Sequence, residues 1–511
     1  MNRTSRLLAL ATLPLLAGCT LDPVDLKPEQ KTPDAWSSKT GSANASVSDE
    51  WWKDFRDSGL DTVVARALAA SPDLDSAYAR VRSARAAAGL ADSGFWPTLG
   101  TSASATRSRT SESNAFGAPS ATGNNYAAGA SLGYEVDLWG RVRNESNAAA
   151  ADYRSSHADL AAARLLIAAE TTKLWLDLRQ AKAERAILAG ELASRTQAHA
   201  LYTAREKAGL IGGDEVARSK LNADQARYEL DAIELKVALL RNALATAVGE
   251  FPGASPLPEP AEELPADAPA VPLGVPSVLL KSRPDVASAD LRLDAALARE
   301  GAARANFYPN LTLSASGGFS SVNSGDLFDS GSRVWSIGPS VNLPLFTGGR
   351  NDARLEQARA AFDATWAAYR KTILGAFRET EDALVTLDRL NTQEKSVAAI
   401  VASANDTLTF AKARFDKGLS SNLEVTLAER DALSAKRELV RVRFDRLRAT
   451  ANLARALGGG WNRDTSIDRS ADAFEERLDE REAALEKAKA DQDAADKARS
   501  ETDAKKPDGA K

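Results

Sequence analysis

Four segments of the chain alternate apolar and polar residues with a period of two. In the clearest segment, Leu132 and Tyr134 fall on one face, whereas Ser131 and Glu135 fall on the other. Such alternation is typical of β-strands with one apolar and one polar face. The predicted strands lie near 98–106, 126–138, 310–319 and 333–343, and the first has the weakest pattern.

Two long stretches without proline follow the strand pairs and predict very long helices over 141–208 and 350–417. At a rise of about 1.5 Å per residue, each helix would reach about 100 Å. Glycine follows each stretch, at Gly209 and Gly418, where a helix cap of positive φ is expected. Apolar or small residues with heptad spacing predict a coiled-coil seam. The seam residues are Leu160, Ile167, Leu174, Ala181 and Leu188 in the first helix and Tyr369, Ala376, Ala383, Leu390 and Val397 in the second.

The chain contains an internal duplication. The motif Phe95-Trp96-Pro97 matches Phe307-Tyr308-Pro309, and the turn Gly209-Leu210 matches Gly418-Leu419. Each copy is predicted to contain a helix, two strands, a very long helix and a shorter returning helix. The shorter helices are expected at 72–94 and 213–249 in the first copy and at 284–306 and 421–457 in the second.

The duplication and changes of composition divide the chain into predicted segments. A proline-rich stretch between the copies predicts an extended linker along the outside of the molecule. The last segment is rich in Ala, Lys, Arg, Asp and Glu, as expected for a solvated tail. The segments are 1–18, a signal peptide; 19–70, a lipid anchor and N-terminal periplasmic segment; 71–250, the first repeat; 251–281, the linker; 282–460, the second repeat; and 461–511, the charged tail.

The N-terminus has the features of a lipoprotein signal. Arg3 and Arg6 precede an apolar run that ends at Leu16-Ala17-Gly18-Cys19, and small residues before a cysteine favour cleavage after Gly18 and lipidation of Cys19. Cys19 is the only cysteine of the chain. The alternative is a buried cysteine behind an ordinary signal. Thr20, rather than an aspartate, follows the cysteine, which favours the outer membrane.

The composition argues against several classes of function. With a formal net charge of -5 and lysine and arginine spread throughout, the chain has no basic patch for nucleic acid. Two histidines and one cysteine leave little material for a metal or histidine-based catalytic site. His157 and His199 both fall in the first long helix, without a nucleophile or carboxylate pattern around them, and both are expected to be exposed helix histidines. We therefore expect no enzyme activity, no metal and no cofactor.

The strands raise the question of a membrane. No stretch after the signal approaches the roughly 18 to 20 continuous apolar residues of a transmembrane helix, so any passage through a bilayer must use strands. Alternation alone fits equally a soluble sheet packed on helices. Four strands cannot close a barrel, and open edges are not tolerated in lipid. Three chains with four strands each would close a 12-stranded barrel, which favours the membrane interpretation.

Six short motifs occur in order along the chain. They are Trp51-Trp52-Lys53-Asp54-Phe55, the two Phe-x-Pro motifs at 95–97 and 307–309, Asp137-Leu138-Trp139-Gly140-Arg141, the stretch 343–350 and the final Ala456-Leu457-Gly458-Gly459-Gly460-Trp461. Together they resemble the TolC-like outer-membrane factors, most closely the lipidated NodT family that serves resistance-nodulation-division pumps. The resemblance covers the chain from Cys19 to Trp461.

The resemblance implies a mixed α/β fold that is mostly α. It implies a homotrimer in which coiled-coil helices form an α-barrel tunnel through the periplasm and the strands complete a 12-stranded transmembrane β-barrel. The expected partners are a periplasmic adaptor (membrane fusion) protein, an inner-membrane pump of the resistance-nodulation-division type, and outer-membrane lipid.

The resemblance also implies roles for residues at the ends of the helical hairpins. The turns Gly209-Leu210 and Gly418-Leu419 would form the periplasmic tip that docks the adaptor. The family's gate has a leucine, an aspartate and an arginine early in the second returning helix, which match Leu423, Leu427 and Arg430. Because leucine replaces the aspartate, an apolar constriction is expected, with charge from Glu424 or Glu429. The alternative role for these residues is ordinary helix packing.

The leading hypothesis is a passive exit duct of a tripartite efflux system in the outer membrane, lipid-anchored and with a long periplasmic extension. The second hypothesis is a lipid-anchored periplasmic coiled-coil scaffold without a pore. The alternating strands, placed at the turns between helices, argue against the scaffold. The third, an enzyme, lacks candidate residues.

Overall fold

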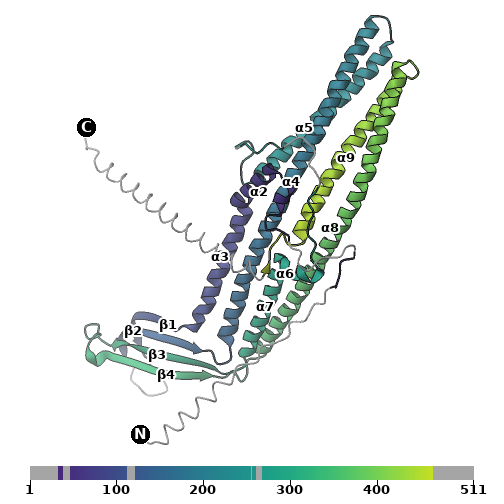
Figure 1. Ribbon diagram of the computed structural model, residues 1–511. Coiled ribbons are helices and arrows are strands. Elements are labelled where there is room, and N and C mark those ends of the chain that lie inside the picture. Colours follow the sequence, from purple (N-terminus) through teal and green to yellow (C-terminus); the bar gives the residue numbers. More distant parts are fainter. Residues whose placement is uncertain (1–32, 38–46, 112–120, 255, 261–267, 464–511) are drawn as a thin grey trace, which may run out of the picture. The chain divides into compact units, whose positions relative to one another are not determined.

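The computed structural model describes residues 33–37, 47–111, 121–254, 256–260 and 268–463. These residues form a mostly helical fold with one four-stranded antiparallel sheet (Figure 1). They belong to two compact units. The first comprises Asp75–Ser156 and Asp285–Phe377, and the second comprises the described residues of Pro33–Leu74, His157–Pro284 and Arg378–Lys511. None of the helices within these described residues is both long and apolar enough to cross a membrane.

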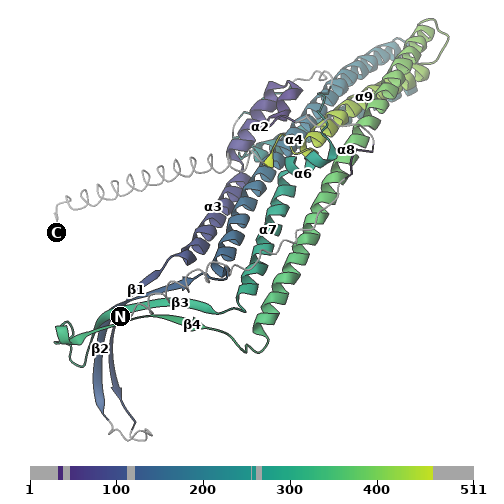
Figure 2. The same cartoon turned by 60° about the horizontal axis from the view of Figure 1, so that its bottom comes forward.

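The sheet lies in the first unit. Its strands are β1 (Thr98–Arg109), β2 (Thr122–Val136), β3 (Asn310–Ser321) and β4 (Arg333–Asn342). They lie side by side in chain order (Figure 2), so β1 and β4 are the two edges. The strand pairs of the two copies thus join into one sheet through β2 and β3.

The register of the strands places most of the apolar residues of all four on one face, which we call the apolar face. Leu99 lies opposite Leu132, Leu132 opposite Ala315, and Ala315 opposite Ile337. Directly opposed residues point to the same side of a sheet, so these four side chains form one row. The other face, which we call the polar face, consists almost entirely of Ser, Thr, Gly and Asn. The alternation expected from the sequence is therefore confirmed.

The end of β2 differs from the expected strand, which ran to residue 138. The strand ends at Val136 because the next residue caps a helix. The Asp137 carboxylate accepts hydrogen bonds from the backbone N–H groups of Val142 (3.0 Å) and Arg143 (2.9 Å). A carboxylate at a helix N-terminus satisfies amides that have no partner within the helix. Residues 137–140 therefore form a turn.

The two copies contain helices of equal length in the same order. The long helices are α4 (Arg141–Lys207) and α8 (Arg350–Asp416), with 67 residues each. The returning helices are α5 (Gly213–Ala247) and α9 (Asn422–Ala456), with 35 residues each. Figure 1 shows two helical hairpins, one of α4 and α5 and one of α8 and α9. The helices α3 (Pro72–Asp92) and α7 (Pro284–Ala305), each with proline at its first position, precede the strand pairs.

Each returning helix ends at a glycine that contacts the segment before α3 or α7. A Cβ on Gly249 would lie 2.2 Å from the carbonyl oxygen of Ala70, and one on Gly458 would lie 1.8 Å from that of Ser282. Both glycines also have positive φ, +76° and +96°, which favours glycine. The same close contact therefore occurs in both copies and requires a residue without a side chain.

The sequence did not predict the helix α2 (Ser58–Ala70), which lies in the expected N-terminal segment. The carboxylate of Asp57 caps it by accepting from the amides of Gly59 and Leu60. The same carboxylate accepts from Trp175 Nε1 (2.8 Å) and Arg179 Nη1 (2.8 Å) of α4. Asp57 thus fixes α2 to α4, because a single carboxylate can satisfy several donors. A short helix, α6 (Leu279–Ser282), likewise ends the expected linker.

The described residues 33–37 are held on the second unit by specific contacts. The indole of Trp36 is 6% exposed, and its Nε1 donates to the carbonyl oxygen of Gly274 at 2.7 Å. The backbone N–H and hydroxyl of Ser37 donate to the two carboxylate oxygens of Glu381. These contacts attach the first described residues of the chain to the linker and to α8.

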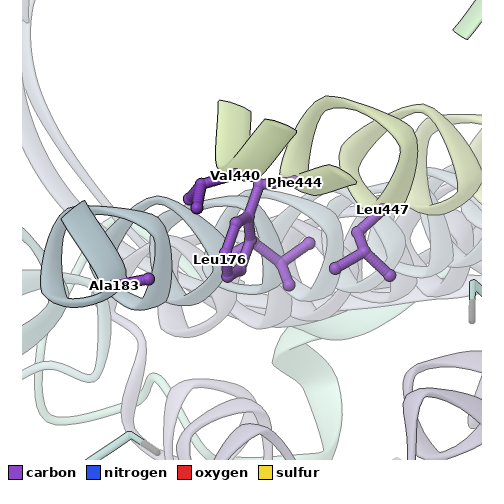
Figure 3. Close-up of a cluster of buried hydrophobic side chains, with 5 residues drawn as sticks. All are labelled: Leu176, Ala183, Val440, Phe444 and Leu447. Carbon is purple, nitrogen blue, oxygen red and sulfur yellow. The ribbon is translucent and has the colours of Figure 1, made fainter. Parts of the chain in front are cut away.

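A compact apolar cluster joins α4 to α9 in the second unit. Figure 3 shows Phe444 and Val440 of α9 packed against Leu176 and Ala183 of α4, with Leu447 beside them. Phe444 is fully buried. Burial of one such side chain stabilises a fold by about 1.5–3 kcal/mol, so this cluster holds the second hairpin against the first.

Candidate functional site

The two hairpin turns that the sequence analysis singled out have the same backbone structure. At the first, the N–H of Gly209 donates to the carbonyl of Glu206 and that of Leu210 to the carbonyl of Arg205. This pair of bonds is the Schellman motif, in which the glycine adopts a left-handed conformation. Gly209 has φ of +72°. The Leu210 side chain is 72% exposed.

The second turn repeats these bonds, from Gly418 to Phe415 and from Leu419 to Arg414, both at 2.9 Å. Gly418 also has φ of +72°, and Leu419 is 67% exposed. Each turn therefore presents one exposed leucine on a rigid cap. Exposed apolar side chains at defined positions are suited to protein contacts.

The three candidate gate residues lie on one face of α9. Positions 423, 427 and 430 are four and three residues apart, which places them on the same side of a helix. Leu423 is 53% exposed and Leu427 is 41% exposed. Arg430 Nη2 lies 3.4 Å from Asp431 Oδ1, and both side chains are largely exposed.

The opposite face of α9 is packed on α8. Val425 and Ala428 are buried against Ala411, with Leu408 and Phe415 beside them. This packing orients the beginning of α9, so the stripe of Leu423, Leu427 and Arg430 faces away from α8. The structure thus brings the three sequence-predicted residues together on an exposed helix face.

An ion-pair group that the sequence analysis missed lies next to this stripe. The Glu429 carboxylate accepts from Arg195 Nη1 of α4 at 2.9 Å and lies 3.2 Å from Lys412 Nζ of α8. Arg195 is only 11% exposed and also lies 3.6 Å from Glu191. Burial raises the pKa of Glu191 above its ordinary value. Glu429 is therefore engaged within the chain, whereas Glu424, 4.0 Å from Arg414, stays half exposed.

A cleft of about 420 Å³ lies between the first hairpin and the start of α9. Its walls include Tyr202 of α4, Arg218 of α5, and Leu423 and Glu429 of α9. Burial raises the pKa of Tyr202. Charged side chains at its walls and an exposed leucine at its edge make the cleft amphipathic.

Gly18 and Cys19 lie outside the described residues. Within the described ranges, no group of histidine, cysteine and carboxylate side chains could hold a metal ion. The expectation that both histidines are exposed is wrong for His157, which is buried. His199 Nδ1 lies 2.9 Å from Ser219 Oγ, which itself donates to the carbonyl of Val216. The Ser219 hydroxyl is thus bound to a helix carbonyl, and Ser219 is one of the residues that line the cleft.

Comparison with known proteins identifies the family. The sequence profile described as outer membrane efflux protein matches residues 63–250 and 275–459. The chain belongs to the outer membrane efflux protein family. The two matched ranges correspond to the two copies of the duplication, and the gap between them falls in the proline-rich linker.

Members of the outer membrane efflux protein family are similar to the chain over nearly its whole length. It is 33% identical to outer membrane protein OprJ of Pseudomonas aeruginosa over 455 residues, which cover 88% of this chain and 95% of OprJ. It is 31% identical to the pyoverdine export outer membrane protein OpmQ of the same organism, with 88% and 96% covered. The solved CmeC outer membrane channel of Campylobacter jejuni matches with a TM-score of 0.79 at 25% identity, covering 89% of this chain and 98% of CmeC.

These findings confirm the expected fold class and function. The chain is an outer-membrane efflux channel with a mostly helical, TolC-like fold. The hairpin turns and the exposed face of α9 are therefore candidate functional regions of this channel.

Proposed function

We propose that three copies of the chain assemble into a passive exit duct, in which their sheets close one 12-stranded barrel. The observation that carries the proposal is the sheet itself. It has four strands, two open edges and a continuous apolar face on which Leu99, Trp335 and Ile337 are more than 70% exposed. Open edges need a strand to pair with, and exposed apolar faces need an apolar environment. Neighbouring copies would provide the first and membrane lipid the second.

A stripe on α5 supports the assembly of identical copies. Leu221, Tyr228, Leu235 and Leu239 are 64%, 73%, 62% and 58% exposed. The first three are spaced by seven residues, as in a coiled-coil seam. We infer that a helix of a neighbouring copy packs on this stripe.

We propose that the turns at Gly209-Leu210 and Gly418-Leu419 dock a periplasmic adaptor protein, which connects the duct to an inner-membrane pump of the resistance-nodulation-division type. The matching Schellman caps support this role, because they present Leu210 and Leu419 in the same way. Two equivalent exposed leucines per chain would give an assembly of three copies a ring of docking points.

We propose further that Leu423 and Leu427 form an apolar gate at this end of the duct. Their exposure on the free face of α9 supports this role, as does the engagement of Glu429 within the chain. Arg430, beside Asp431, would complete the ring. We expect Leu423→Ala combined with Leu427→Ala to raise single-channel conductance in planar bilayers, whereas the control Leu201→Ala, at a 51% exposed leucine of α4, leaves it unchanged. Equal conductance of both variants would assign Leu423 and Leu427 to helix packing.

The polar face of the sheet supports a duct without its own substrate selection. Among its described positions only Glu135 is charged, and the rest are mainly small hydroxyl, amide and glycine residues. The one carboxylate of this wall is already paired with Arg141, so the wall offers little charge to select or retain a ligand. We propose that the pump determines what is exported and that the chain performs no chemistry.

We propose that cleavage after Gly18 and lipidation of Cys19 anchor the mature chain in the outer membrane, as in the lipidated NodT-type branch. The attachment of Trp36 to Gly274 supports a tether. Cys19 lies 17 positions before Trp36 in the sequence, so the lipidated residue can lie at most about 60 Å from this point. We propose that the chain consists, in order, of a signal peptide, an N-terminal segment, the first repeat, the linker, the second repeat and the charged tail.

The experiment that tests the assembly uses cross-linking between the two edges of the sheet. Cys19→Ala removes the only thiol, and Ser102→Cys on β1 with Ser336→Cys on β4 adds one at each edge. A flexible bis-maleimide should then give dimers and trimers but no larger species in outer membranes. Each single-cysteine variant is the control and should give none.

The mass of the detergent-solubilised Cys19→Ala protein provides a second readout. A trimer without lipid supports the closed assembly, with the lipid as an accessory anchor. A monomer released freely into the periplasm would contradict it and favour the periplasmic scaffold.

A further inference from the structure

Charged residues are rare in the four strands, and they are distributed unevenly. The strands contain four of them, namely Arg107, Arg109, Glu135 and Arg333. The register assigns each to a face of the sheet. Arg107 and Arg109 have the parity of Leu99 on β1, and Arg333 has the parity of Trp335 on β4, so all three arginines lie on the apolar face. Glu135 lies on the polar face, opposite Thr312.

The three arginines also lie at one end of the sheet. Arg109 is the last residue of β1, and Arg333 is the first residue of β4. Because the strands are antiparallel, both positions are at the end where the β1–β2 and β3–β4 connections lie. The helices α4 and α8 follow β2 and β4 at the other end. The apolar face is thus basic at the end away from the helices, and no acidic residue shares it within the described strands.

The arginines lie on the two edge strands and on neither central strand. This inference rests on the proposed trimer, in which β4 of one copy adjoins β1 of the next. Each of the three seams would then carry Arg333 of one copy beside Arg107 and Arg109 of its neighbour. A single chain holds only parts of the group, which the assembly completes.

We propose that these three arginines bind the phosphate groups of lipid A at each seam, in the outer leaflet of the outer membrane. Guanidinium groups form paired, charge-assisted hydrogen bonds with phosphate oxygens. The apolar face adjoining them on the helix side, with Trp335 79% and Ile337 76% exposed, would contact the acyl chains. A lipid with two phosphates matches several arginines better than a phospholipid with one.

The position relative to the membrane distinguishes the ligand. In the proposed duct the helices extend into the periplasm, so the basic end of the sheet faces the outside. The lipids at that level belong to the outer leaflet, which in these membranes consists mainly of lipopolysaccharide. The occupant is therefore lipid A rather than a phospholipid of the inner leaflet.

The test compares lipid retention by purified full-length trimers. The variant combines Arg107→Gln, Arg109→Gln and Arg333→Gln, which removes the charge and keeps polar side chains. The matched control combines Arg82→Gln, Arg143→Gln and Arg389→Gln, three exposed arginines of the helices. Trimers in detergent are titrated with hexa-acylated, bis-phosphorylated lipid A, and native mass spectrometry counts the molecules bound.

The wild type and the control should bind one lipid A for each protomer, and the triple variant should bind at least about tenfold more weakly, since several charge-assisted bonds are lost. Monophosphoryl lipid A should bind the wild type more weakly than the bis-phosphorylated form. Equal retention by the wild type and the triple variant, with both trimeric, would overturn this inference and leave the duct intact. Phosphatidylglycerol binding as tightly as lipid A would also overturn it. Failure of the unaltered chain to form trimers would instead reject the proposed assembly.

Discussion

The helices α5 and α9 are equivalent parts of the duplication, yet they differ in how they are used. Both have 35 residues, and both end in the same glycine cap. Six residues of α5 are buried, compared with fourteen of α9. The two copies thus share the same backbone structure, whereas the side chains of α5 and α9 differ in how far they are buried.

The difference is clearest at matched positions, using the offset that relates Gly209 to Gly418. The stripe of α5 corresponds position by position to three arginines and one phenylalanine of α9. The matched pairs are Leu221 and Arg430, Tyr228 and Arg437, Leu235 and Phe444, and Leu239 and Arg448. Three of the α9 residues act inside the chain. Arg437 donates to Glu229, Phe444 is in the apolar cluster, and Arg448 donates to Asp177 and Gln180.

The returning helix of the second copy, α9, is largely packed within the chain, whereas that of the first copy, α5, keeps an exposed apolar stripe. On α9, arginines form ion pairs with α4 and α5, which fixes the helix in the second unit. On α5, the same positions carry apolar side chains that the chain itself leaves exposed. Apolar stripes without an internal partner mark contact surfaces.

The largest effect is expected for a charge placed in the α5 stripe. Leu235→Glu should abolish the trimer, because a carboxylate without a partner would be buried at every seam. The fold of the single chain should survive, since Leu235 is 62% exposed. Light scattering of the detergent-solubilised protein gives the mass. Lys236→Glu, on the exposed polar side of α5, serves as the control and should remain trimeric. A trimeric Leu235→Glu variant would show that the stripe faces lipid, detergent or water.

The matched position on α9 should affect the fold rather than the assembly alone. Phe444→Ala removes a fully buried ring and should lower the free energy of unfolding by about 3–5 kcal/mol. Circular dichroism during urea unfolding of the helices measures this loss. A loss below about 1 kcal/mol would mean that the cluster in Figure 3 contributes little to the attachment of α9.

A smaller loss of folding stability is expected when Arg448 of α9 is replaced by leucine, the residue at the matching position of α5. Arg448→Leu removes the donor to Asp177 (2.7 Å) and Gln180 (2.8 Å), and should cost about 1–3 kcal/mol because these partly buried acceptors lose their partner. Its counterpart Leu239→Ala should leave the unfolding of the chain nearly unchanged. If the two variants unfold alike, the two helices are not distinguished by internal ion pairing.

Some of these features follow from the sequence and others do not. The sheet was predictable because alternation at Leu132 and Tyr134 depends only on neighbouring residues. The glycine caps were predictable because Gly209 and Gly418 end matching stretches. The contacts of Asp57 with Trp175 and of Arg195 with Glu429 join distant segments, and no local pattern indicates which charges meet.

The α5 stripe lies between these cases. An alignment of the two copies shows that apolar residues of α5 correspond to arginines of α9 at three of the four positions. This difference indicates that the two helix surfaces have diverged. The pattern alone could not tell which copy would be buried within the chain. The burial of α9 depends on its packing against α4, which joins segments far apart in the sequence and is seen only in the three-dimensional structure.

The smallest effect concerns the contact of the linker with the first hairpin. Glu259 pairs with Lys182 of α4 and Arg241 of α5. The hydrogen bond from Lys182 lowers the pKa of Glu259 below its ordinary value of 4.5. A lowered pKa in the folded state means that the pair stabilises the fold above the pKa of the unfolded chain. This stabilisation is lost as the pH falls through the folded pKa.

Glu259→Gln should therefore lower stability at pH 7 by up to about 1 kcal/mol, the usual range for an exposed ion pair. The variant and the wild type should converge as the pH falls below about 4.5. Thermal unfolding across this pH range measures the difference, and Glu234→Gln on α5 provides a control with an exposed carboxylate. A difference that persists unchanged in acid would mean that Glu259 acts through packing of the linker rather than through its charge.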